Sequence, residues 1–79
     1  MNEAPLRDYH INIFYSDEDE CYVADLPDFE YCSAFGDTPQ EALAELLIAK
    51  EGWLEAAREH GIPPPVARYR PAIYQAAAG

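Results

Sequence analysis

The sequence predicts an α+β fold in which one long helix covers one face of a three- to four-stranded antiparallel sheet, in the order β-β-β-α(-β). Three observations predict it. The first half of the chain holds three short runs rich in β-forming residues. A long segment with helical periodicity and a clear start signal follows them. The links between the runs are too short for parallel crossovers, so the strands should be antiparallel.

The three strands are expected at 9–15, 21–26 and 31–35. Alternate side chains of the first strand are apolar and would share one half-buried face: Tyr9, Ile11, Ile13 and Tyr15. The charged stretch 17–20 then forms a turn. Pro27 ends the second strand, because proline has no N–H to donate to a ladder.

A capping box marks the start of the helix. Thr38 can cap it, Pro39 suits its first turn, and Glu41 stands three residues after the cap. The Thr38 hydroxyl is expected to accept from the Glu41 amide, while the Glu41 carboxylate reaches back to the Thr38 amide. Gly36 permits a tight bend before the helix, and Asp37 places negative charge beside its positive end. A well-made helix start explains all of these residues without invoking a function.

The helix should run from about Pro39 to His60, with Gly61 as a left-handed stop. A helical projection places these apolar residues in one arc: Ala42, Leu43, Leu46, Leu47, Trp53, Leu54 and Ala57. Glutamates occupy the opposite arc: Glu41, Glu45, Glu51, Glu55 and Glu59. The helix therefore covers one face of the sheet and has an acidic back. Residues 66–69, or 72–74, are expected to add a short edge strand.

Two places break the helical pattern. Lys50 stands within the apolar arc, where either its methylenes cover the core edge while the ammonium reaches water, or it pairs with a carboxylate such as that of Asp25. Ile48 and Gly52 lie one turn apart on the acidic side. A glycine inside a helix costs about 1 kcal/mol relative to alanine. An isoleucine beside it suits a docking surface, although single exposed hydrophobic residues are also normal.

Composition limits the classes of function. The 79 residues form one domain, 1–79, with a core at about 9–65 and an edge strand and tail at 66–79. Fifteen acidic and five basic side chains give a net charge of −10, which argues against nucleic-acid binding. The charge would steer the chain toward a basic partner, and solubility alone explains it equally well. The sequence has no secretory signal or membrane-length apolar run, so we expect a cytoplasmic protein.

No motif for catalysis or for a metal stands out. The acidic stretch 17–20 lacks the spacing and central glycine of an EF-hand loop and is better explained as a solvated turn. His10, His60, Cys21 and Cys32 have no local ligand spacing, and the two cysteines make no disulfide framework. We therefore expect no enzymatic activity, no metal and no cofactor. A nuclease that holds Mg²⁺ through a carboxylate cluster is the catalytic alternative.

Three segments together resemble the HicB-like antitoxin family. They are Tyr22-Val23-Ala24-Asp25-Leu26-Pro27-Asp28, Gly36-Asp37-Thr38-Pro39-Gln40-Glu41-Ala42 and Gly61-Ile62-Pro63-Pro64-Pro65, and the resemblance covers roughly residues 9 to 65. It implies a partial ribonuclease-H-like fold, usually without nuclease activity. It also implies a role in a type II toxin–antitoxin pair, in which the antitoxin blocks HicA, a small basic RNA-cleaving toxin.

The chain departs from the family pattern in two ways. Many members carry a C-terminal DNA-binding module, whereas this chain stops at Gly79, so direct DNA binding is not expected. The family's Pro-Gly-Cys-like segment before the third strand reads Asp28-Phe29-Glu30-Tyr31-Cys32 here. We therefore expect a different turn at this position.

Two hypotheses about function follow. In the first, the chain is an antitoxin-type protein that neutralises a HicA-type toxin by direct contact. Its candidate partner-binding residues are Asp17, Glu18, Asp19, Glu20, Asp25, Asp28, Glu30, Ile48 and Gly52. In the second, the chain is a solitary HicB-like domain that forms a structural homo-oligomer, with neither toxin nor catalysis. It would then self-associate through its C-terminal segment and through Tyr31, Phe35, Tyr69 and Tyr74.

Overall fold

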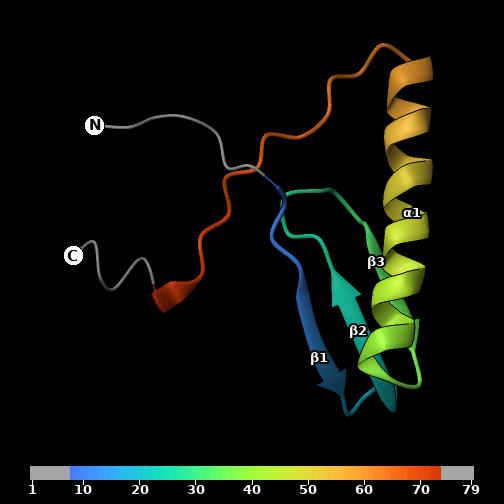
Figure 1. Cartoon of the computed structure of the whole chain (residues 1–79), viewed down its shortest axis with the longest axis vertical. Helices are drawn as coiled ribbons and strands as arrows, with labels where there is room; N and C mark the ends of the chain where they lie inside the picture. Colours follow the sequence, from blue (N-terminus) through green and yellow to red (C-terminus); the bar gives the residue numbers. More distant parts are fainter. Residues whose placement is uncertain (1–7, 74–79) are drawn as a thin grey trace.

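The computed structural model describes residues 8–73, and they form one antiparallel sheet and one long helix. The elements are β1 (Asn12–Ser16), β2 (Cys21–Asp25), β3 (Ser33–Gly36) and α1 (Pro39–Glu59). β2 is the central strand and pairs antiparallel with both neighbours. Figure 1 shows α1 on one side of the sheet, next to β3. The predicted α+β class is therefore confirmed.

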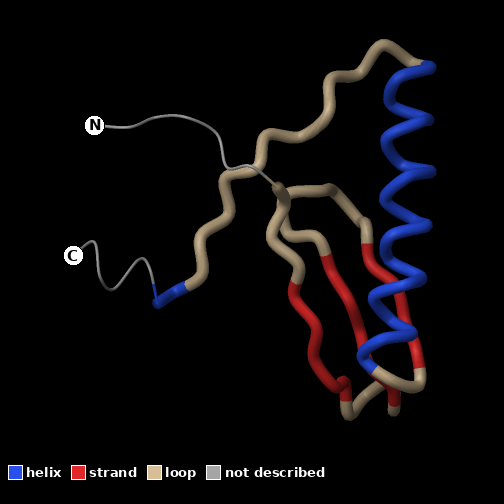
Figure 2. Tube along the Cα trace, in the orientation of Figure 1, coloured by secondary structure: helices blue, strands red, loops and turns tan. Residues whose placement is uncertain are grey.

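The predicted fourth strand at 66–69 is wrong. Within residues 8–73 the sheet has three strands, and the chain from Gly61 to Pro71 crosses back toward the start of β1 as a loop (Figure 2). The amides of Arg68 and Tyr69 donate to the Asp28 carboxylate, so they are not available for a ladder. The alternative strand at 72–74 is also not seen, since Ala72 and Ile73 are helical, while Tyr74 lies outside the described residues.

The start of α1 largely follows the predicted capping box. Thr38 is extended, with φ −131° and ψ 160°, and its Oγ1 accepts from the Glu41 amide at 3.1 Å. The second half of the prediction is off by one residue, because Glu41 Oε1 accepts from the Asp37 amide at 3.0 Å rather than from that of Thr38. At the other end, Gly61 has φ 68° and is the left-handed stop that the sequence predicts.

Gly36 is required by close packing rather than by a bend. A Cβ atom at this position would lie 2.4 Å from the backbone N of Ala42 and 2.8 Å from the carbonyl C of Glu41. Both atoms belong to the first turn of α1, and backbone atoms cannot rotate away as a side chain can. The end of β3 and the start of α1 can therefore touch only because residue 36 has no side chain.

The core is small and rich in alanine. Its buried residues come from β2, β3, α1 and the turn between β2 and β3: Ala24, Leu26, Phe29, Cys32, Ala34, Ala42 and Leu46. Small side chains at Ala24, Ala34 and Ala42 let the helix lie close to the sheet. The predicted apolar arc is correct for Leu46 but wrong for Leu47, which is 42% exposed.

The helix packs mainly over β3 and β2 and leaves β1 largely uncovered. Ile13 is the register partner of Ala24 and therefore lies on the helix side, yet it is 40% exposed. Tyr15, on the same side, is 52% exposed and stacks edge-on against Tyr22 with ring centroids 5.2 Å apart. The prediction of a half-buried face on the first strand fails at these two positions, because the helix does not reach them.

Aromatic side chains close the end of the sheet away from the β1–β2 turn. The Tyr9 ring meets Phe29 edge-on at 4.7 Å between centroids, and Phe29 meets Trp53 in the same way at 4.9 Å. The Tyr9 hydroxyl also donates to the Pro65 carbonyl at 2.6 Å. These contacts join the start of the chain, the β2–β3 turn, the helix and the loop after it.

Candidate partner-binding surface

The predicted acidic stretch forms the tight turn between β1 and β2, and all four of its residues are exposed. The Ser16 hydroxyl donates to Asp19 Oδ2 at 2.9 Å and accepts from the Asp19 amide at 3.2 Å. Glu20 has φ 55°, and its amide donates to the Ser16 carbonyl at 2.8 Å. The turn is therefore held by its own hydrogen bonds while its carboxylates face solvent.

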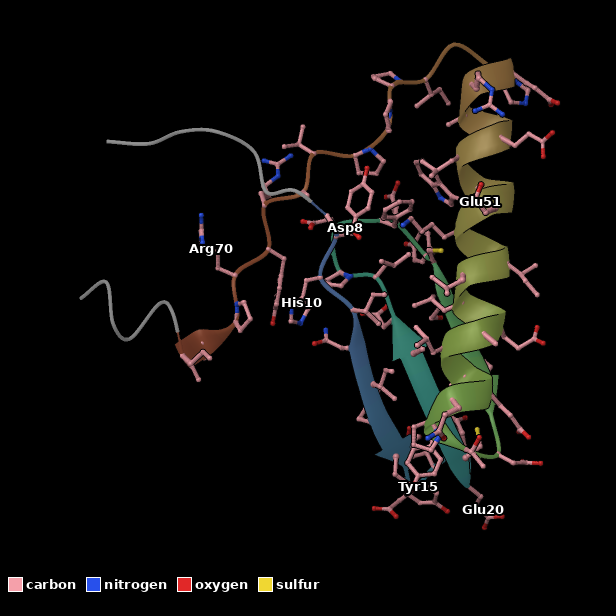
Figure 3. The ribbon with its side chains drawn as sticks, viewed as in Figure 1. Asp8, His10, Tyr15, Glu20, Glu51 and Arg70 are labelled. Carbon is pink, nitrogen blue, oxygen red and sulfur yellow. The ribbon has the colours of Figure 1, made fainter. Side chains whose placement is uncertain are left out.

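This turn lies at the same end of the molecule as the start of α1 (Figure 1). Figure 3 shows Tyr15 and Glu20 at that end, below the first turn of the helix. Asp37 and Glu41, also exposed, add two further carboxylates there. We refer to this region as the acidic end and define it by these residues: Asp17, Glu18, Asp19, Glu20, Asp37 and Glu41.

A groove continues from the acidic end along the outer edge of β3. It has a volume of about 740 Å³ and lies between β3 on one side and the flank of α1 on the other. Phe35 and Ile48 are its large apolar residues and are 55% and 67% exposed. Glu41 and Glu45 stand on the helix side of the same groove. We call it the β3 groove and define it by Cys21, Ser33–Gly36, Asp37, Glu41, Glu45, Ile48 and Ala49.

The other predicted acids lie at the opposite end of the sheet. Asp25 ends β2, and Asp28 and Glu30 belong to the turn that follows it. The Asp28 carboxylate accepts from the amides of Arg68 and Tyr69 at 3.2 and 3.1 Å. The structure thus splits the predicted acids into two groups and gives Asp28 an internal partner. It places Ile48 beside the first group, on the groove.

The lysine and arginine side chains within residues 8–73 lie away from the acidic end. Lys50 Nζ is 3.8 Å from Asp8 Oδ1 and 5.4 Å from the centroid of the Tyr9 ring, and its side chain is 19% exposed. Of the two readings for Lys50, the structure supports a carboxylate partner, but that partner is Asp8 rather than Asp25. Figure 3 shows Arg70 on the far side of the molecule from Glu20. Among the residues that line the β3 groove, none is basic.

The cysteine and histidine side chains named as possible ligands were checked for partners and for metal-binding geometry. Both cysteines are free, and burial raises the pKa of the Cys32 thiol above its ordinary value of 9.0, with the Asp25 carboxylate acting in the same direction and Lys50 against it. His10 hydrogen-bonds to Asn12 Oδ1 at 2.7 Å and packs on the Tyr69 ring. Within residues 8–73, no group of three or more Cys, His, Asp or Glu side chains is placed to hold a metal ion.

The sequence analysis did not identify Phe35 as a groove residue, nor Asp28 as the residue whose carboxylate binds the amides of Arg68 and Tyr69. The first was within reach, because β3 alternates and Ala34 is the small core residue, so Phe35 must point to the other face. No local signal marks Asp28, since its partners stand forty residues later in the chain.

No family model and no solved structure matches the chain. The chain is similar to a UPF0150 protein. That relative, UPF0150 protein ssl0259 from Synechocystis sp. strain PCC 6803, is 46% identical over 39 residues, which are 49% of this chain and 53% of the relative. The chain therefore spans about half the length of the curated relative that it matches. In the described part of the chain, α1 is too polar to cross a membrane.

Proposed function

We propose that this chain is an antitoxin-type binding protein that neutralises a small, basic, mRNA-cleaving toxin of the HicA type by direct contact. The observation that carries the proposal is the acidic end, which adjoins a groove with exposed apolar side chains and no basic residue in its lining. The HicB-like segments of the sequence and the similarity to a UPF0150 protein support it.

The chemistry of an RNA-cleaving partner explains why such a surface would inhibit it. A ribonuclease holds the phosphates of its substrate with Lys and Arg side chains. Carboxylates grouped on a rigid turn and on the first turn of a helix present the same sign of charge as those phosphates. The acidic end would therefore associate quickly with the basic surface of the toxin and cover it.

Apolar contacts would hold the complex once it has formed. Exposed charge pairs each contribute only about 0.2–1 kcal/mol, so they favour encounter more than lasting binding. Ile48 and Phe35 expose large apolar side chains beside the acids, and burying apolar surface contributes about 25 cal/mol per Å². In this proposal the protein acts by binding alone, in the cytoplasm, without catalysis or a cofactor.

Co-expression with the product of the adjacent gene tests the proposal. We expect the two chains to co-purify, the complex to weaken as salt rises, and RNA cleavage by the basic chain to stop in the complex. The double variant Asp17→Lys/Glu18→Lys should weaken binding about tenfold or more. The matched variant Glu51→Lys/Glu55→Lys has the same net charge and should bind nearly as the parent does. A basic neighbour that neither binds nor loses activity would show the proposal to be wrong.

One observation favours the second hypothesis, a homo-oligomeric interaction domain. On the sheet face away from α1, Phe14 and Phe35 flank Val23 in register and are both more than half exposed. A second copy could bury this aromatic row. Sedimentation should then show a dimer at micromolar concentration that Phe14→Ser dissociates, whereas a monomer of the parent chain would contradict it.

A further inference from the structure

We propose that the β3 groove is a strand-addition site, in which an extended and positively charged segment of a partner pairs with the free edge of β3. The inference rests on the proposed function and deepens it, because it names the segment of the partner that binds and how it is held. Strand addition to an exposed sheet edge is a general mode of peptide recognition.

The edge of β3 is open. β3 pairs with β2 alone, and within residues 8–73 no other backbone or side-chain group hydrogen-bonds to its outer side. In an antiparallel strand, alternate residues direct their N–H and C=O groups away from the neighbour that is already paired. β3 therefore presents unpaired donors and acceptors along the groove. An exposed edge of this kind is a template for another strand.

The helix overhangs this edge. Figure 1 shows α1 on the β3 side of the sheet, where it packs over β3 and β2. One stripe of the helix, at intervals of four and three residues, lines the groove: Glu41, Glu45 and Ile48. A strand added to β3 would lie beneath this stripe and would bring α1 over the centre of a four-stranded sheet. Gly52 follows Ile48 one turn later, and a Cβ atom there would meet nothing within 4 Å, so the helix surface is also open beyond the groove.

The lining of the groove selects the sequence of the added strand. Successive side chains of a strand point to opposite faces of the sheet. Those on the helix side would meet Glu41 and Glu45, and those on the other side would pack beside Phe35. Glu45 makes no hydrogen bond or ion pair with another described residue. The groove therefore fits a segment in which basic and apolar residues alternate.

Charge also argues against a second copy of this chain in the groove. Edge-to-edge pairing of two β3 strands would bring Asp37, Glu41 and Glu45 of both copies together, and each copy carries a net charge of −10. Like charges placed side by side in this way are destabilising. A basic segment of a partner would instead place positive charges beside these carboxylates, which is favourable.

The test uses the full chain and a synthetic peptide of alternating lysine and valine, about eight residues long and blocked at both ends, which is enough to span β3. The control peptide has the same sequence with every backbone amide N-methylated, so it keeps the charge but has no N–H to donate to the edge of β3. We expect the first peptide to slow hydrogen exchange at amides within Ser33–Gly36 and the control to leave it unchanged. Glu45→Lys should weaken binding of the first peptide about threefold to tenfold. Glu51→Lys, with the same change in net charge but outside the groove, should alter it by less than about twofold.

Several results would overturn the inference. They are equal binding of the two peptides, equal effects of the two lysine variants, and unchanged exchange in β3 when peptide is bound. A dimer whose β3 amides are already protected without peptide would show that a second copy fills the edge. A basic partner that is bound and inhibited without protecting β3 would leave the proposed function standing and overturn the strand-addition site alone. If the peptide protects β3 but the adjacent gene product does not bind, the strand-addition site would stand and the proposed function would be wrong.

Discussion

Two glycines in this chain should respond in opposite ways to the same substitution. Gly36 ends β3 against the first turn of α1, and Gly52 lies on the exposed side of the same helix. A methyl group added at Gly36 would overlap backbone atoms at 2.4 and 2.8 Å, whereas one added at Gly52 would meet nothing within 4 Å. The sign of each effect on stability can therefore be derived from the space around one carbon atom.

The magnitudes follow from known costs. Alanine is favoured over glycine inside a helix by about 0.8–1.0 kcal/mol, so Gly52→Ala should stabilise the fold by nearly this amount. In a domain of this size, 1 kcal/mol shifts Tm by about 4–8 °C. Gly36→Ala forces β3 and the helix start apart, and overpacking of this kind costs about 1–3 kcal/mol. We expect the upper end of that range, because the overlapping atoms are backbone.

Thermal unfolding followed by circular dichroism measures both effects, with all chains at one concentration because self-association would raise Tm. The expected result is a Tm several degrees above the parent for Gly52→Ala and at least about 10 °C below it for Gly36→Ala. A neutral Gly36→Ala would mean that the strand and helix do not touch as described. A destabilising Gly52→Ala would mean that something in the free protein already occupies this side of the helix.

Three further predictions rest on single residues. Tyr31 has φ 61° and is 96% exposed, so Tyr31→Gly should relieve backbone strain and raise stability by about 1 kcal/mol, visible as a higher Tm. Asp28→Ala should free the loop that the carboxylate holds, and trypsin should then cut after Arg68 faster than in the parent. The raised pKa of Cys32 means that the unfolded chain ionises this thiol first, so its contribution to stability is present below pH 9.0 and is lost as pH rises through the folded pKa. Alkaline unfolding, followed as the free energy of unfolding against pH, should be less steep in Cys32→Ala than in the parent.

The parts of the fold that could be predicted are those determined by neighbours in sequence. Thr38, Glu41 and Gly61 mark the helix ends because caps act over three or four residues. The turn at 17–20 was predictable for the same reason. The left-handed φ of 61° at Tyr31 was not predictable in this way, because tyrosine gives no local signal for that conformation.

Which side chains are buried and which residues meet depends on where the helix lies across the sheet, and no local sequence pattern predicts that position. Ile13 and Tyr15 have the alternation of a buried face, but α1 lies over β3 and does not cover them. Leu47 is exposed for the same reason. The partner of Lys50 could not be predicted either, because Asp8 comes to it through the tertiary fold rather than through sequence spacing. Whether the acids form one surface or two was likewise decided by the sheet topology.

Several features that lower the stability of the isolated chain lie along the β3 edge of this sheet. The helix keeps a glycine at Gly52 that alanine would improve, and one turn before it leaves Ile48 exposed. The strand beside them is unpaired on its outer side and exposes Phe35. Glutamates on the same flank have no cation within the groove. Each of these features is ordinary alone, but a sequence under selection for stability only would have removed several of them by single substitutions. Their coincidence along β3 is the reason to look for a partner strand there, because places where a natural sequence departs from its own best local choices tend to be functional.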